Sequence, residues 1–223
     1  VGVEKFPVWR ELIDEEGQCM YLPEQLRTGK PYPIKAMIGS GMNYRMWPDS
    51  EGFLRSLDNL DLLVNVELFM TETCKYSDIV LPACTSAERS ELRCYPMGYI
   101  TFTRPAIKPL YDSKPDVDII FELAERLGID DPLFRAGYDA CIDYILEPSG
   151  IKTEELKKHP EGMFVPNPCP FPPRKYLEKG FATPSGKMEF KSTVLEKYEG
   201  KPGFEPLPVY RPPFYSHEFS PGL

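Results

Sequence analysis

The sequence is poor in the residue types that build most protein metal sites. It has two histidines, His159 and His217, and six cysteines that are spread along the chain without a CxxC pair. Structural zinc sites and iron–sulfur clusters need about four ligands at recognisable spacings. We therefore expect no metal site formed by this chain alone, and buried free thiols at the cysteines. These are Cys19, Cys74, Cys84, Cys94, Cys141 and Cys169.

Long apolar runs and an excess of positive charge are missing as well. No stretch of about 18 apolar residues occurs, so we expect no membrane insertion. The 34 acidic and 26 basic residues give a formal charge of -8, which argues against a nucleic-acid partner because phosphates would be repelled. The chain begins at Val1 without the layout of a signal peptide, so we expect a processed chain or a fragment of a longer one.

The chain has 223 residues, of which 42% are hydrophobic, and this is enough for a buried core. Compact apolar runs at 33–39, 61–69 and 78–83 predict three strands, and helical spacing at 50–60 separates the first two. Apolar strands that do not alternate with polar residues suit a parallel sheet. The sequence therefore predicts an α/β fold, a Rossmann-like three-layer parallel sheet with helices on both faces.

The strongest helix signal lies at 113–128. Ser113 is a candidate cap and Gly128 a candidate terminator. Weaker helices are expected near 136–146 and 152–158, and a short one near 7–13. The apolar face expected for the strongest helix contains Val117, Ile120, Phe121, Ala124 and Leu127.

Proline becomes dense after His159, with six prolines in 159–174 and five in 201–214. Proline lacks an N–H and fixes φ, so we expect extended connectors there, with a turn, a strand and a short helix between them at 181–198. We divide the chain into a lead-in segment (1–30), a Rossmann-like α/β domain (31–158) and a proline-rich C-terminal extension (159–223). The last would lead toward a C-terminal domain outside this chain.

Polar loops follow the first two predicted strands. After the first, Gly41 would let the backbone approach a ligand closely, and Asn43 offers a donor and an acceptor. After the second, Glu67 could accept hydrogen bonds from a ribose or a guanine edge, while Thr71 and Thr73 could meet a phosphate at a helix start. Ligands of parallel sheets bind beyond the carboxyl ends of strands, so we predict that these five residues bind a cofactor.

Each signal also has an ordinary structural alternative. A glycine turn after a strand is often simple geometry, Glu67 could be a solvated carboxylate, and Thr71 or Thr73 could be a plain cap. The absence of GxGxxG argues against an ordinary nicotinamide dinucleotide fold. Asp78 and Glu88 are interpreted as structural residues that pair or cap.

The order of these motifs resembles the molybdopterin oxidoreductase family of the dimethyl sulfoxide reductase type. The resemblance runs from about Pro31 to Tyr198 and includes the Gly41-x-Asn43 turn, the strand that ends in Glu67, and the sequences AERLG and TPSGKMEF. Its most specific part is the run TETCKYSDIVLPA, which a glutamate follows.

Some positions depart from the family pattern. Tyr44 stands where the family usually has proline, and Cys74 and Ser77 stand where alanines are common. The stretch 88–110 lacks the frequent E-G-T-x-x-N-x-E-G-R pattern, which leaves the subfamily and the substrate open.

The resemblance implies loops that help hold bis(molybdopterin guanine dinucleotide), carrying molybdenum or tungsten, in a full-length parent. Gly41 and Asn43 would approach the dinucleotide, and Glu67, with Thr71 nearby, would lie near the guanosine. The parent would catalyse two-electron redox or oxo transfer on a small substrate. An iron–sulfur cluster and the metal ligand are expected upstream, so this chain would hold no catalytic residue and be inactive alone.

The partners that the resemblance implies are the remaining domains of the parent chain and an electron-transfer subunit. Two other functions stay open at this point. One is a noncatalytic α/β interaction module whose proline-rich tail docks a partner in extended form. The other is a nucleotide-binding domain of an unrelated enzyme.

Overall fold

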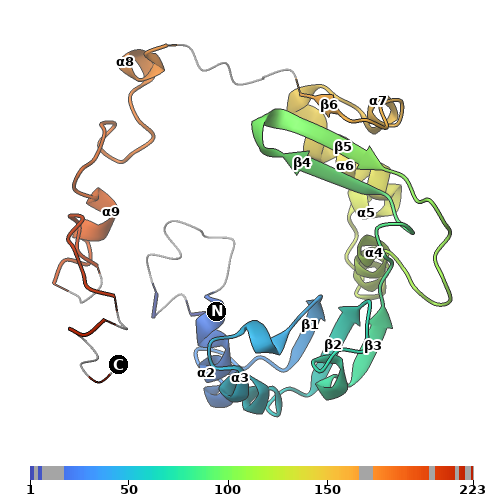
Figure 1. The fold of residues 1–223 in the computed structure, drawn as a ribbon, viewed down its shortest axis with the longest axis horizontal. Helices are drawn as coiled ribbons and strands as arrows, with labels where there is room; N and C mark the ends of the chain where they lie inside the picture. The colour runs from blue at the N-terminus through green and yellow to red at the C-terminus, as the bar shows by residue number, and fades with distance from the viewer. Residues whose placement is uncertain are drawn as a thin grey trace. The chain divides into compact units, whose positions relative to one another are not determined.

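The computed structural model describes residues 1–2, 5–6, 18–165, 173–200, 204–213, 216–218 and 222. The chain divides into two compact units, Met20–Pro170 and a second formed by Val1–Cys19 with Phe171–Leu223 (Figure 1). The helix expected near 7–13, Cys169 and part of the proline-rich segments lie outside the described residues. The domain boundaries expected at residues 30 and 158 stay a prediction.

The first unit contains the expected parallel sheet. Its strands are β1 (Ala36–Ser40), β2 (Leu62–Glu67) and β3 (Ile79–Pro82), in the order β1-β2-β3. Both pairings are parallel, with Ile38 opposite Val64 and Val64 opposite Ile79. The three apolar runs thus form the three strands, and the α/β prediction is confirmed.

Helices α2 (Leu22–Thr28) and α3 (Ser50–Leu57) cover one face of this sheet. Helix α3 begins where the Asp49 side chain accepts a hydrogen bond from the Gly52 N–H at 2.8 Å. Phe53 is fully buried and stacks on Trp47 with ring centroids 4.0 Å apart. Burial of a side chain of this size stabilises the fold by about 1.5–3 kcal/mol.

Helix α4 (Asp116–Arg126) lies over the other face. It begins after Pro115, two residues later than the Ser113 cap predicts, because the Ser113 hydroxyl donates to the Leu110 carbonyl instead. Gly128 follows with a φ of 73°, which agrees with the expected terminator. The predicted apolar face is only partly buried, since Ile120 and Leu127 are exposed.

A second, antiparallel sheet was missed by the sequence analysis. It consists of β4 (Glu91–Tyr95), β5 (Tyr99–Thr103) and β6 (Met163–Phe164), in that order. The 3-10 turn η4 (Pro96–Gly98) joins the first two strands. Helices α5 (Pro132–Ala136), α6 (Tyr138–Leu146) and α7 (Thr153–Leu156) follow, with η5 (Glu147–Ser149) after α6. Helices α6 and α7 confirm the two weaker helix predictions, whereas α5 was not predicted.

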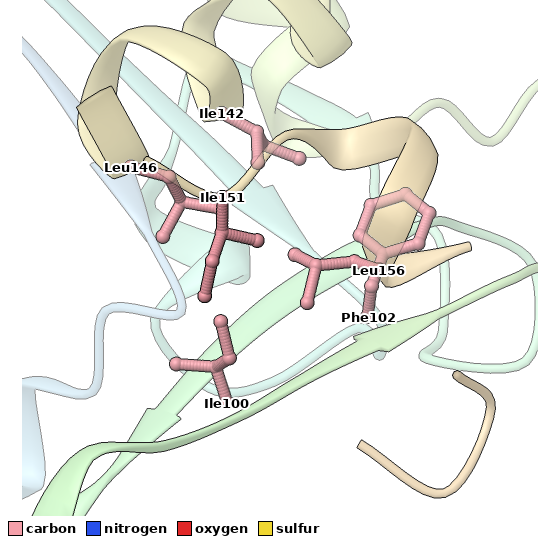
Figure 2. Packing of buried hydrophobic residues seen from close by; sticks show 6 residues of the cluster. All are labelled: Ile100, Phe102, Ile142, Leu146, Ile151 and Leu156. Carbon is pink, nitrogen blue, oxygen red and sulfur yellow. The ribbon is translucent and has the colours of Figure 1, made fainter. Parts of the chain in front are cut away.

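This sheet and its helices share a core of their own. Figure 2 shows six buried side chains that point toward one another between β5 and the helices. Asp143 on α6 holds the start of α7, since it accepts hydrogen bonds from the N–H and the hydroxyl of Thr153 at 2.7 Å each. The core residues are Ile100, Phe102, Ile142, Leu146, Ile151 and Leu156.

The second unit contains two short helices, α8 (Lys175–Lys179) and α9 (Thr193–Glu196). The expected turn occurs, with the Gly186 N–H donating to the Thr183 carbonyl at 2.9 Å. The strand expected after it is not formed within the described residues 187–192. The Glu189 carboxylate instead accepts hydrogen bonds from Ser185 and Thr193 and makes this stretch a compact loop.

Candidate cofactor site

A cleft of 560 Å³ lies at the carboxyl edge of the parallel sheet. Its walls come from the ends of all three strands, the loop 84–91 and the start of α4. This is the edge at which parallel α/β sheets bind ligands. The polar lining includes the hydroxyls of Ser40, Thr85, Ser86, Ser90 and Tyr138.

Gly41 lines the cleft directly after β1. Its φ of 60° lies in the left-handed region that favours glycine, and its N–H donates to the Val66 carbonyl at 3.0 Å. A Cβ added to Gly41 would meet no atom within 4 Å. The backbone here therefore faces open space, and a ligand could approach it closely.

Glu67, the last residue of β2, also lines the cleft and is half-buried. One of its carboxylate oxygens, Oε1, accepts a hydrogen bond from the Leu68 N–H at 2.7 Å. A carboxylate has about four acceptor positions, so this bond orients the group and leaves acceptor capacity for a ligand.

The other three predicted residues organise the loops beside the cleft. Asn43 caps the short helix η2 (Tyr44–Met46), accepting from the Arg45 N–H at 3.1 Å. Thr73 is buried and accepts from the Tyr44 N–H at 3.2 Å, which ties the two loops together. Thr71 accepts from the Cys74 N–H at 3.4 Å, at the start of η3 (Cys74–Tyr76). Their direct role toward a ligand stays a prediction.

Two charged residues that the sequence analysis did not single out for the site face this cleft together. Asp116, at the start of α4, accepts hydrogen bonds from the Ser40 hydroxyl at 2.6 Å and from the Arg89 guanidinium. Arg89 also donates to the Cys84 carbonyl at 3.4 Å. A parallel bridge between Ala83 and Lys114 lies next to this contact and holds the two segments side by side.

Glu88 anchors the loop that carries Arg89. Its side chain is 5% exposed and accepts hydrogen bonds from the Thr85 N–H, the Thr85 hydroxyl and the Leu110 N–H, each at 2.7 Å. The Thr85 N–H, the Thr85 hydroxyl and the Leu110 N–H lower the pKa of Glu88, because they stabilise its charged form. Asp78 likewise accepts from the Leu63 N–H at 2.7 Å, so both residues have the structural role expected from the sequence.

No cluster of three histidine, cysteine or acidic side chains within the described ranges is placed to hold a metal ion. The thiols of Cys74 and Cys84 are buried as expected, whereas Cys19 and Cys94 are exposed. That part of the prediction was wrong, because strand β4 carries Cys94 on an exposed side. No helix among the described residues is long and apolar enough to cross a membrane.

Comparison with known proteins assigns this geometry to a family. The family profile described as molybdopterin oxidoreductase matches residues 23–126, which include all three parallel strands and α4. The chain belongs to the molybdopterin oxidoreductase family. The family implies a molybdopterin cofactor that carries molybdenum or tungsten, and membership rules out a domain of an unrelated enzyme.

Relatives of this oxidoreductase family carry different activities in their names. The chain is 32% identical to acetylene hydratase of Syntrophotalea acetylenica over 89% of its length and 26% of that protein. It is 30% identical to dimethyl sulfoxide reductase DmsA of Escherichia coli over 95% of its length and 30% of that protein. The solved structure of acetylene hydratase from Pelobacter acetylenicus matches with a TM-score of 0.70 at 30% identity.

The chain spans about a quarter of these relatives. The structural match covers 90% of this chain and 27% of the acetylene hydratase chain. The described residues therefore correspond to one part of a molybdopterin oxidoreductase.

The chemistry of the cleft fits the nucleoside part of a pterin dinucleotide better than its phosphates. The lining includes three carboxylates, those of Glu67, Glu91 and Asp116, and one cation, Arg89, which Asp116 already pairs. Carboxylates accept hydrogen bonds from ribose hydroxyls and from the N–H groups of guanine, but they repel phosphate oxygens. The residues present thus fit a guanosine.

Proposed function

We propose that this chain helps bind the guanosine arm of a bis(molybdopterin guanine dinucleotide) cofactor in a longer parent enzyme. The observation that carries the proposal is the cleft in which Glu67, Asp116 and the open backbone at Gly41 meet at the carboxyl edge of the sheet. Family membership indicates that the ligand is a molybdopterin cofactor. The cleft is lined by several hydrogen-bond acceptors, which favour the nucleoside end of such a cofactor over its phosphates.

Each residue would have a distinct task. Glu67 would accept hydrogen bonds from the guanine edge or the ribose, and its bond to the Leu68 N–H keeps it oriented. Asp116 is held by Ser40 and Arg89, so it would present a preset acceptor rather than a mobile one. Asn43, Thr71 and Thr73 would support the binding loops through the contacts described above.

The bound cofactor would supply the redox chemistry, while this chain would orient one arm of it. For the parent we propose two-electron redox or oxo transfer on a small substrate, since several relatives are named as dimethyl sulfoxide or trimethylamine-N-oxide reductases. We also place an iron–sulfur cluster upstream in the parent and an electron-transfer subunit among its partners.

A hydratase is the second candidate. Acetylene hydratases match this chain in both sequence and structure. Hydration adds water without net electron transfer, so the two candidates predict different assays. A parent that reduces an oxide substrate with a reduced dye would support the first, and one that turns over substrate without consuming the dye would support the second.

Glu67→Ala in the full-length parent tests the guanosine site. Loss of the carboxylate would leave donors of a buried ligand unpaired, at a cost of about 1–3 kcal/mol, or roughly a tenfold to hundredfold loss of affinity. The measurement is guanine released per folded molecule after dilution and mild heating. Thr71→Ala should cost less.

Glu72→Ala is the matched control, because Glu72 is an exposed carboxylate in the same loop region that pairs with Lys75. It should leave cofactor content unchanged. Full occupancy in the Glu67→Ala parent would contradict the site assignment without touching the family assignment.

A further inference from the structure

The face of the parallel sheet under α4 is largely open. Ile38, Leu62 and Ile79, one from each strand, are 48%, 37% and 46% exposed. With Ile119 and Leu123 of α4, and with Leu127 directly after it, they bound an apolar groove of 680 Å³. The opposite face differs sharply, since the next residue along β2, Leu63, is only 2% exposed beneath the helices α2 and α3.

This asymmetry points to an interface. Parallel sheets occur almost only with both faces covered, because their strands are apolar on both sides. An apolar surface of this extent on a soluble domain marks a site of interaction. Helix α4 covers only one side of the groove. The apolar side chains at positions 119, 123 and 127, spaced four residues apart, line this side of the groove.

We propose that an amphipathic helix from another part of the parent chain docks in this groove, alongside α4. The solved relative holds the same fold within a chain of which this one covers 27%, so a large remainder of the parent is available to supply it. Neighbouring helices on a sheet pack about 8–10 Å apart, which places the docked helix against the apolar side chains of α4 that line the groove.

The groove also sets the length and chemistry of its occupant. Strands of five and six residues span about 17–20 Å, which a helix of about 11–13 residues would cover. Its inner stripe should be leucine, isoleucine, valine or methionine at helical spacing. Its flanks should be polar where the groove meets the charged rim of Lys114, Glu122 and Arg126.

Thiol labelling of the full-length parent tests this proposal, followed by peptide mass spectrometry. Ile38→Cys should react on the order of 100-fold more slowly in the folded parent than in the denatured one. Leu63→Cys is the matched reference, since Leu63 on β2 is 2% exposed and packs on the face that α2 and α3 already cover. Ile79→Cys gives an independent result if the first variant does not fold.

Three outcomes would overturn the proposal. One is labelling of both groove positions at the denatured rate. Another is protection that disappears when the parent is diluted to monomer, which would make the occupant a second copy. The third is protection lost after extraction of a bound apolar small molecule. None of these outcomes would affect the guanosine-arm proposal, because the groove and the cleft have no lining residue in common among the described residues.

Discussion

Glu88 shows how a single buried carboxylate can hold a binding loop. It accepts hydrogen bonds from Thr85 and Leu110, residues on separate segments that border the cleft. The same loop carries Arg89, so the anchor and the charged group that faces the cleft are neighbours in sequence. Loss of the anchor should affect the stability of the loop first.

Glu88→Gln in the parent should lower the melting temperature at neutral pH while cofactor per folded molecule stays constant. Because the folded pKa of Glu88 is lowered, its stabilisation is complete above the ordinary glutamate pKa of about 4.3 and is lost as pH falls through the folded value. The variant should lack this pH-dependent contribution to the free energy of unfolding. Denaturation curves recorded at several acidic pH values measure the contribution.

Glu125→Gln on the exposed surface of α4 is the control for that comparison. If Glu88→Gln and the wild type lose stability equally on acidification, Glu88 does not act as the anchor that its contacts indicate.

At the scale of single residues, local signals located Gly41 just after a strand and Glu67 at the end of one, and both line the cleft. That they bind a cofactor stays a prediction. Arg89 and Asp116 lie 27 residues apart, and tertiary contacts such as the bridge between Ala83 and Lys114 and the bond from Leu110 to Glu88 bring them together. No local pattern in the sequence reports such a tertiary contact.

At the scale of elements, the stacked pair of Trp47 and Phe53 should hold α3 on the sheet. Phe53→Ala should lower the free energy of unfolding by about 3–5 kcal/mol, because it removes a fully buried ring and leaves a cavity. Urea denaturation measures the change. Phe190→Ala, at a side chain that is 79% exposed, should stay within about 0.5 kcal/mol of the wild type; equal losses in the two variants would contradict this core assignment.

Helices and strands were predicted correctly where their apolar residues form a long run or a clear periodic pattern. The three parallel strands and α4 come from long apolar or periodic runs. Strand β5 was missed although its buried residues Ile100 and Phe102 alternate with polar ones, because an alternation over only five residues is a weak signal. The strand expected after Gly186 is not formed within the described residues 187–192, because the Glu189 carboxylate accepts hydrogen bonds from the Ser185 N–H and the Thr193 hydroxyl, and these contacts favour a loop.

At the scale of the whole molecule, the purified chain should contain no stoichiometric molybdenum, tungsten or iron and show no reductase activity. The described residues offer no metal-binding cluster, and one cleft would hold only one arm of the cofactor. Elemental analysis by mass spectrometry measures this, with the full-length parent as the positive control. About one equivalent of any of these metals in the chain alone would refute it.

The first unit has two separate hydrophobic cores, and this should lower the cooperativity of its unfolding. The buried residues around Phe53 and those around Ile142 form clusters with no common member among the described side chains. Cooperative unfolding requires that the loss of one contact weakens the rest, and two separate cores weaken that coupling. Amide exchange should therefore divide into two groups with different opening free energies, so that one half can fray while the other keeps its native packing.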